Sequence, residues 1–231
     1  IDTVGGYGRY SVDALWRLDA LDKLGGTLFL GSVEDALGLP IRRFIAPQIP
    51  NTDRSDNMAA IKSIFSLTNA FSGVRGRWKT NLNPFEFLGF ARAIRFARAD
   101  AVQTIDVGQT TAVVDEELPD GTVQKSLDRD RLDAILGRAY EDIAIRTEGL
   151  SVAVFNTTET PTLGQRIARL LSRIGVLVVA VGNEIATVDR CELRGKKEAL
   201  GSATAKRIVY YFGCDSKVGE SERADLILFL G

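Results

Sequence analysis

The last eighty or so residues alternate between short apolar runs and amphipathic helical segments, and this alternation constrains the fold most strongly. Strands are predicted at 151–155, 176–181, 186–193 and 225–230. Apolar residues at helical spacing predict helices over 160–174 and 202–212. The run 176–181 is apolar throughout and predicts a buried strand. The pattern predicts an α/β domain of β-α-β-β-α-β order, in which two helices lie on one small sheet.

The first two thirds of the chain mix helix and strand signals, which also indicates an α/β class. Helices are expected over 12–24, 32–37, 58–71, 84–99 and 128–140, and strands over 41–46, 102–107, 111–117 and 123–127. Ser32 and Asp128 predict N-caps of the helices over 32–37 and 128–140, and Gly38 predicts the end of the first of these. The order of Asn83, Pro84 and Glu86 is typical of a capping box that opens a helix.

Burial and boundaries follow from the same pattern. The helix over 84–99 is expected to bury one apolar side, made of Phe87, Leu88, Phe90, Ala91 and Ile94. Residues 119–121, of sequence PDG, predict the turn of a hairpin. The segment 143–149 is interpreted as a polar linker. We therefore expect two domains, 1–147 and 148–231.

Composition excludes several classes of function. The 29 Lys and Arg residues and 30 Asp and Glu residues give a net charge of −1, so nothing favours non-specific nucleic-acid binding. Histidine is absent, which excludes the usual Ser-His-Asp and Cys-His mechanisms. Two cysteines cannot form a Cys/His zinc site. An enzyme on this chain would use carboxylates, Lys, Arg or bound Mg²⁺.

Two basic segments contain the candidate ligand-binding residues. Arg42 and Arg43 form the first, and Arg75, Arg77 and Trp78 form the second. Guanidinium groups bind phosphate in a bidentate manner, and Trp78 beside two of them could face a sugar ring. The alternative interpretation is a set of ordinary exposed charges.

Other motifs have simpler readings. Residues 5–8, of sequence GGYG, lack the spacing of a nucleotide-binding loop and predict a turn. The acidic run 115–117 lies on a predicted strand, so its side chains alternate between faces and predict a solvated edge, with no metal site. Asn156 begins an N-x-T sequence that fits either a glycosylation acceptor or, as we prefer, a loop after a strand.

The two cysteines leave two interpretations open at this point. Cys191 and Cys214 both lie in the predicted C-terminal domain. They are either two buried free thiols or a disulfide, which an oxidising compartment would favour. A bond requires the two Cα atoms to lie within about 7 Å of each other.

Residues 150–231 resemble the LytR C-terminal domain of bacterial cell-envelope proteins. The resemblance rests on residues 152–158 (VAVFNTT), 163–168 (LGQRIA), 171–175 (LSRIG) and 224–231 (ADLILFLG). The first part of the chain resembles a divergent LytR-CpsA-Psr (LCP) domain that is incomplete at its N-terminus. That likeness rests on residues 5–10 (GGYGRY) and 32–41 (SVEDALGLPI).

The resemblance implies a membrane-anchored, extracytoplasmic protein of the cell envelope, with its anchor outside this chain. It also implies the Cys191–Cys214 disulfide, since disulfides persist outside the cytoplasm. Typical LCP proteins transfer glycopolymers from polyprenyl-pyrophosphate carriers to peptidoglycan with Arg and Asp side chains and Mg²⁺. Their D-x-L-G-G-V and Y-V-R-x-R segments have no counterpart here, so no catalytic residue is assigned.

Two functions are therefore weighed. The first is a non-catalytic LCP-like protein that binds cell-wall polymer or scaffolds other envelope proteins, without a cofactor. The alternative is a divergent phosphoglycosyl transferase that depends on Mg²⁺. A transferase should gather Arg and acidic side chains at a deep apolar cleft that accepts a lipid tail. Arginines scattered over the surface would favour binding.

Overall fold

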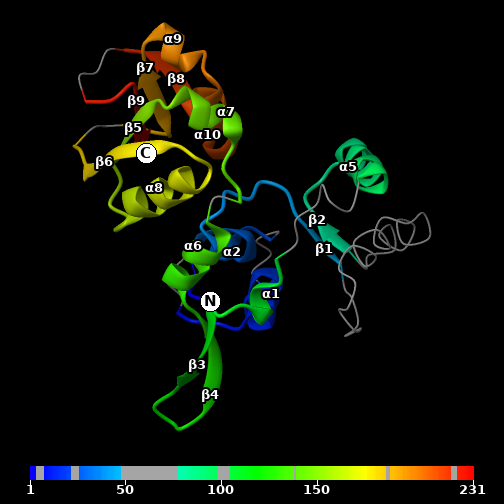
Figure 1. The fold of residues 1–231 in the computed structure, drawn as a ribbon. Coiled ribbons are helices and arrows are strands. Elements are labelled where there is room, and N and C mark those ends of the chain that lie inside the picture. The colour runs from blue at the N-terminus through cyan, green and yellow to red at the C-terminus, as the bar shows by residue number, and fades with distance from the viewer. Residues whose placement is uncertain are drawn as a thin grey trace. The chain divides into compact units, whose positions relative to one another are not determined.

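The computed structural model describes residues 1–3, 8–21, 26–47, 78–97, 105–137, 139–185, 188–219 and 223–231. The chain divides into two compact units. One combines Ile1–Ile41 with Gly108–Gly231, and the other is Arg42–Val107. Figure 1 shows their elements along the chain. Among the described residues, none of the helices combines the length and the apolar character that crossing a bilayer requires.

A five-stranded mixed sheet forms the C-terminal part of the first unit (Figure 1). Its strands are β5 (Ser151–Asn156), β6 (Leu177–Asn183), β7 (Glu192–Gly195), β8 (Asp215–Val218) and β9 (Leu226–Leu230). Their order in the sheet is β6-β5-β9-β7-β8. Strand β5 is parallel to β6 and β9, whereas β7 is antiparallel to β9 and parallel to β8. The α/β class is confirmed. The strand predicted over 186–193 begins only at Glu192, as β7, and β8 adds a fifth strand to the four that the sequence predicts.

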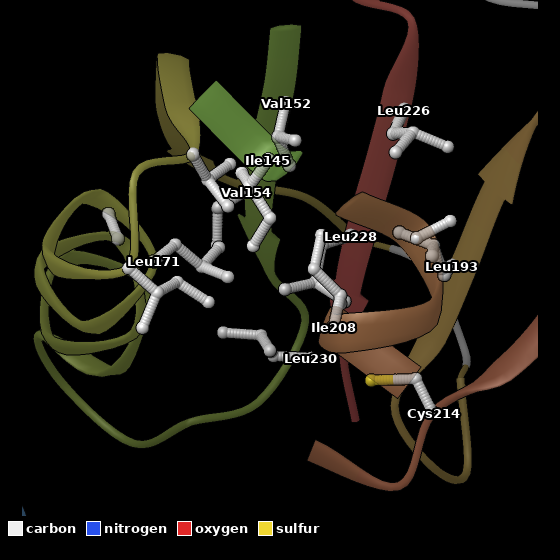
Figure 2. Close-up of a cluster of buried hydrophobic side chains, with 14 residues drawn as sticks. Ile145, Val152, Val154, Leu171, Leu193, Ile208, Cys214, Leu226, Leu228 and Leu230 are labelled. Atoms are coloured by element: carbon white, nitrogen blue, oxygen red, sulfur yellow. The ribbon is translucent and has the colours of Figure 1, made fainter. Parts of the chain in front are cut away.

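Three helices pack against one face of this sheet. They are α7 (Ile143–Glu148), α8 (Leu163–Arg173) and α10 (Ala203–Phe212), and the short α9 (Lys197–Leu200) precedes α10. The buried side chains between them and the sheet form one cluster, which includes Val152, Leu171, Ile208, Leu226 and Leu228. Figure 2 shows these side chains converging between α8 and α10. The predicted helices over 160–174 and 202–212 are thus present, and their apolar faces make the core.

The segment predicted as a polar linker is instead helix α7. Asp142 caps this helix, because its side chain accepts a hydrogen bond from the Ala144 amide at 2.9 Å. Ile145 is 1% exposed and belongs to the core of the sheet. Glu148 accepts hydrogen bonds from the amides of Ala203 and Thr204, at 2.6 and 2.8 Å. The segment is structured because Ile145 packs into the core, Asp142 caps α7, and Glu148 binds the N-terminus of α10. The domain limits 1–147 and 148–231 stay a prediction.

Strand β6 was predicted to be buried, and this was wrong. It lies at an edge of the sheet, and exposed residues alternate along it, with Val179 48% exposed. Its apolar composition is compatible with an edge position, because the register shifts beside β5 between Val152 and Ala153. A bulge of this kind twists an edge strand and hinders pairing with other chains.

Within its described residues, the N-terminal part of the first unit contains three α-helices and a hairpin. They are α1 (Val12–Leu21), α2 (Thr27–Leu37), α6 (Arg129–Leu136), β3 (Val113–Glu117) and β4 (Val123–Leu127). The predicted hairpin is confirmed, and Gly121 makes its turn with φ of 80°. Asp128 caps α6 as predicted, by accepting from the Arg131 amide at 3.0 Å. The helix ends before Gly137, short of the predicted residue 140.

Ser32 does not cap a helix, so this prediction was wrong. Helix α2 begins at Thr27 and ends at Gly38, and Ser32 is buried inside it. The Ser32 hydroxyl donates to the Leu28 carbonyl at 2.7 Å, one helical turn earlier. A serine that satisfies its hydroxyl in this way is compatible with a helix interior. The apolar residues before it therefore extend the helix.

The second unit contains β1 (Ile45–Pro47), β2 (Trp78–Thr80) and α5 (Pro84–Phe96). The capping box at Asn83 and Glu86 is confirmed: each side chain accepts from the other residue's amide at 2.9 Å. The expected burial of α5 was wrong, because no residue of this helix is buried and Leu88 is 69% exposed. The helix predicted over 58–71 lies outside the described residues, as do residues 102–104 of the strand predicted over 102–107. Residues 105–107 are not in a strand, and Val107 begins a short 3-10 helix (Val107–Gln109).

Candidate functional site

The basic residues singled out from the sequence belong to the second unit. Arg43 pairs with Glu86, at 2.7 Å between Nη2 and Oε1. The backbone carbonyl of Arg42 accepts from the Asn81 amide group at 2.7 Å. Trp78 begins β2, where its backbone pairs with Pro47. Arg75 and Arg77 lie outside the described residues. A ligand site formed by these residues stays a prediction.

The predicted disulfide between Cys191 and Cys214 is present. The two Cα atoms are 4.5 Å apart, which satisfies the required limit. Cys191 directly precedes β7, and Cys214 directly precedes β8. The Asp215 amide also donates to the Cys191 carbonyl at 2.9 Å. The disulfide therefore fixes the beginnings of two neighbouring parallel strands, and Cys214 is buried in the core beside them.

A groove of about 420 Å³ lies beside this disulfide, at β7 and β8. It is lined by Val188, Asp189, Arg190, Cys191, Glu192, Arg194, Asp215 and Lys217. Six of these eight residues carry charge, three of each sign. The volume lies in the range of about 300–1,000 Å³ that is usual for small-molecule sites. We call this feature the β7–β8 groove.

A buried carboxylate organises the floor of the β7–β8 groove. The Glu192 side chain is only 5% exposed, and it forms ion pairs with Arg194 and Lys217. Burial opposes ionisation of Glu192, but the hydrogen bonds from Lys217 and Arg194 outweigh it and lower its pKa. The Arg194 guanidinium also lies over the Phe229 ring, 4.5 Å from the centroid. Arg194 is thus held between a carboxylate and an aromatic face, which restricts its orientation.

The rim of the groove offers charges that are not engaged. Asp189, Arg190 and Asp215 are exposed. Within the described part of the chain, their side chains form no hydrogen bond and no ion pair. Exposed charged groups beside a buried ion pair can exchange water for a ligand at small cost. The arrangement can therefore hydrogen-bond polar ligands that carry hydroxyl, amide or charged groups.

A second charged cluster joins α6 and α8 in the first unit. Asp133 forms ion pairs with Arg169 and Arg173, at 2.6 and 2.5 Å. Arg173 is 8% exposed and also donates to the carbonyls of Asp133 and Gly137. Burial opposes ionisation of Asp133, but the hydrogen bonds and charges of the two arginines outweigh it and lower its pKa. These arginines are committed to structural contacts.

Asp35 of α2 forms ion pairs with two more arginines. It pairs with Arg166 at 2.8 Å and with Arg129 at 2.9 Å. A cavity of about 30 Å³ next to Arg129 corresponds to the volume of about one water molecule. The arginines therefore converge, as a transferase would require, but each forms an ion pair with Asp35 or Asp133, and the adjoining space is too small for a lipid.

The other motifs take separate positions. Glu116 pairs with Arg9 at 2.5 Å, whereas Asp115 lies 4.0 Å from Lys125. The neighbouring carboxylates thus face different cations, as predicted for a strand. Among the described residues, no group of three His, Cys, Asp or Glu side chains could hold a metal ion. Asn156 is buried and donates to the Thr160 carbonyl at 2.9 Å, which agrees with the loop interpretation.

Sequence reasoning missed the residues of the β7–β8 groove other than Cys191. Glu192 and Arg194 are two positions apart on β7, and Asp215 and Lys217 are two positions apart on β8. This period of two places each pair on one face of its strand. The signal was present, but β8 has no apolar pattern that would identify it as a strand.

Comparisons of the chain with protein-family models, with curated proteins and with solved structures give no match. The resemblance to LytR and LCP domains therefore remains an interpretation of the sequence. The chemistry of the β7–β8 groove has to support the function by itself.

Proposed function

We propose that the chain is an extracytoplasmic protein of the bacterial cell envelope that binds cell-wall polymer without catalysing its transfer. The β7–β8 groove carries this proposal, because it is open, polar and charged with both signs. Hydroxyl, amide and carboxylate groups of a wall polymer are the partners that such side chains hydrogen-bond. The anchor in the membrane would lie outside this chain.

The disulfide supports the location. Disulfides form and persist in oxidising compartments and are rare in the cytoplasm. Here the bond lies beside the groove and joins its two strands. An oxidising exterior would therefore also favour the binding-competent arrangement of β7 and β8.

The transferase alternative is less well supported by the geometry. A pyrophosphate leaving group needs cations that are free to contact it. Arg166, Arg169 and Arg173 on α8 are instead paired with Asp35 and Asp133. The groove at β7 and β8 has charged walls, which do not suit a polyprenyl tail.

Co-sedimentation of the full chain with purified insoluble cell-wall sacculi tests the proposal. The groove variant is Lys217→Glu on β8, and its matched control is Lys197→Glu on α9, which is also exposed. We expect the parent and the control to sediment with sacculi, and the groove variant to bind at least about tenfold more weakly, because it loses a cation and gains a repulsive charge.

Equal binding by the groove variant and the parent would contradict a site at β7 and β8. A second measurement addresses the alternative. Mg²⁺-dependent binding of a polyprenyl-pyrophosphate carrier, without binding to sacculi, would favour the transferase and overturn the proposal.

A further inference from the structure

The charges of the β7–β8 groove are separated along the strands. Strands β7 and β8 are parallel, and their register places Glu192 beside Asp215 and Arg194 beside Lys217. Neighbouring residues in register project to the same face of a sheet. Carboxylate therefore lies beside carboxylate near the disulfide, and cation lies beside cation two residues further along.

In the absence of a bound ligand, this arrangement of charges lowers the stability of the fold. Like charges directly opposite each other on neighbouring strands are destabilising. Glu192 offsets part of the cost, because both Arg194 and Lys217 contact it. One buried carboxylate cannot neutralise two cations, however, so an excess positive charge remains at their end. Asp215 has no cation partner among the described side chains.

The remaining lining residues strengthen the separation. Asp189 and Arg190 precede Cys191 and so belong to the end of the groove that contains Asp215. That end holds three carboxylates and one guanidinium, whereas the other holds two cations. The groove is neutral as a whole and has an electric dipole along β7 and β8.

We propose that the β7–β8 groove binds a zwitterionic segment of the peptide that cross-links cell-wall glycan chains. The inference rests on the proposed function and names the part of the polymer that is bound. The ligand ammonium lies at Asp189 and Asp215, and its carboxylate lies at Arg194 and Lys217. A neutral glycan would leave Asp215 and the excess positive charge at Arg194 and Lys217 without partners, and a polyanion would be repelled by the acidic end.

The distance between the two charged ends of the groove restricts which zwitterions fit it. Positions two residues apart along a strand are separated by about 6.6 Å. This distance suits an ammonium and a carboxylate that are several bonds apart, as on a peptide with a diamino-acid side chain. The disulfide keeps the two ends in register, because it joins the residues that precede β7 and β8.

Titration of the full chain with three synthetic tetrapeptides that contain a diamino acid, like the cross-linking peptides of cell walls, tests this inference. The first has a free side-chain amine and a free C-terminal carboxylate, the second is acetylated at that amine, and the third is amidated at that carboxylate. We expect each modification to weaken binding at least about tenfold, because each leaves one end of the groove unpaired.

Two variants connect the effects to the two ends. Asp215→Asn should reduce the discrimination against the acetylated peptide, and Lys217→Gln should reduce the discrimination against the amidated peptide. Glu198→Gln and Lys197→Gln on α9 are the matched controls and should retain both. Asp215, Glu198 and Lys197 are exposed, so unchanged melting curves are expected for their variants. Lys217→Gln removes one of the two cations that pair with buried Glu192, so a lower melting temperature is expected for it, and its binding is measured well below that temperature.

The outcomes separate this inference from the proposed function. Tenfold preferences that disappear in the matching variant would support it. If the chain sediments with sacculi but binds all three peptides equally, the inference is overturned and the proposed function stands. The same holds if it sediments with sacculi and binds only a glycan without peptide. A chain that binds neither sacculi nor peptides would overturn both.

Discussion

Removal of the Cys191–Cys214 disulfide should destabilise the C-terminal sheet strongly. The perturbation is the double variant Cys191→Ala/Cys214→Ala, or reduction of the parent protein. Cys214 is buried and Cys191 packs against the same core. Alanine is the suitable replacement, because a serine hydroxyl at Cys214 would be buried without an assigned partner.

The magnitude follows from the loop that the bond closes. The two cysteines are 23 residues apart in sequence. In the chain-entropy model, cross-linking a loop of this size lowers the free energy of folding by about 3 kcal/mol. Loss of sulfur packing at Cys214 adds up to about 1 kcal/mol. A total loss of about 3–4 kcal/mol is a large share of the stability of an ordinary domain, which is about 5–15 kcal/mol.

The assay has to observe the sheet itself. Both tryptophans, Trp16 and Trp78, lie outside it, so their fluorescence does not report on the sheet directly. Hydrogen exchange at the backbone amides of β7, β9 and α10 measures the local free energy of opening instead. We expect the reduced parent to lose about 3 kcal/mol of protection and the double variant up to about 1 kcal/mol more, because only the variant also loses the sulfur packing. A reductant should leave the double variant unchanged. A loss below about 1 kcal/mol, or two alkylatable thiols in the untreated protein, would refute the reasoning.

Three further substitutions test the packing of the core, an ion pair and a helix cap. Ile145→Ala should cost about 3 kcal/mol in the same exchange measurement, since Ile145 is 1% exposed, whereas Ile143→Ala, at an 81% exposed position, should cost less than about 0.5 kcal/mol. Asp133→Asn should cost about 2 kcal/mol at neutral pH, because it removes the carboxylate that forms ion pairs with Arg169 and Arg173. The pKa of Asp133 is lowered in the fold, so its contribution to stability is present above its unfolded pKa of about 3.9 and is lost as pH falls through the folded pKa. The difference in melting temperature between the parent and the variant should therefore disappear in acid. A difference that persists in acid would contradict the ion-pair explanation. Asn83→Ala should lower the stability of α5 by about 1 kcal/mol and reduce the helicity measured by circular dichroism. Glu86→Gln is the control, because it preserves the capping pattern, and it should not reduce helicity. Equal effects of the two variants would show that the cap is not the cause.

Local signals in the sequence predicted several element boundaries correctly. The capping box at Asn83, the cap at Asp128, the helix end at Gly38 and the turn at Gly121 all depend on hydrogen bonds or backbone angles within a few residues. Such interactions are determined by neighbouring residues, so a single sequence contains them. Ser32 shows the limit, because the same hydroxyl can cap a helix or bond to a carbonyl inside it.

Burial was predicted less well, because it depends on the neighbours of an element. The apolar composition of β6 suggested a buried strand, but the strand order places it at the edge. Helix α5 has apolar residues at helical spacing, and none of them is buried. Periodicity identifies the face that could be covered, but only packing decides whether another element covers it.

The sequence by itself determined an α/β chain whose C-terminal part has two amphipathic helices on a sheet, and it placed both cysteines there. It also excluded histidine chemistry. Only the tertiary structure brought Glu192 and Arg194 beside Asp215 and Lys217, because these pairs lie more than twenty residues apart and meet through the register of β7 and β8. Strand order and register are set by the sum of long-range contacts over the whole sheet, which no local pattern contains.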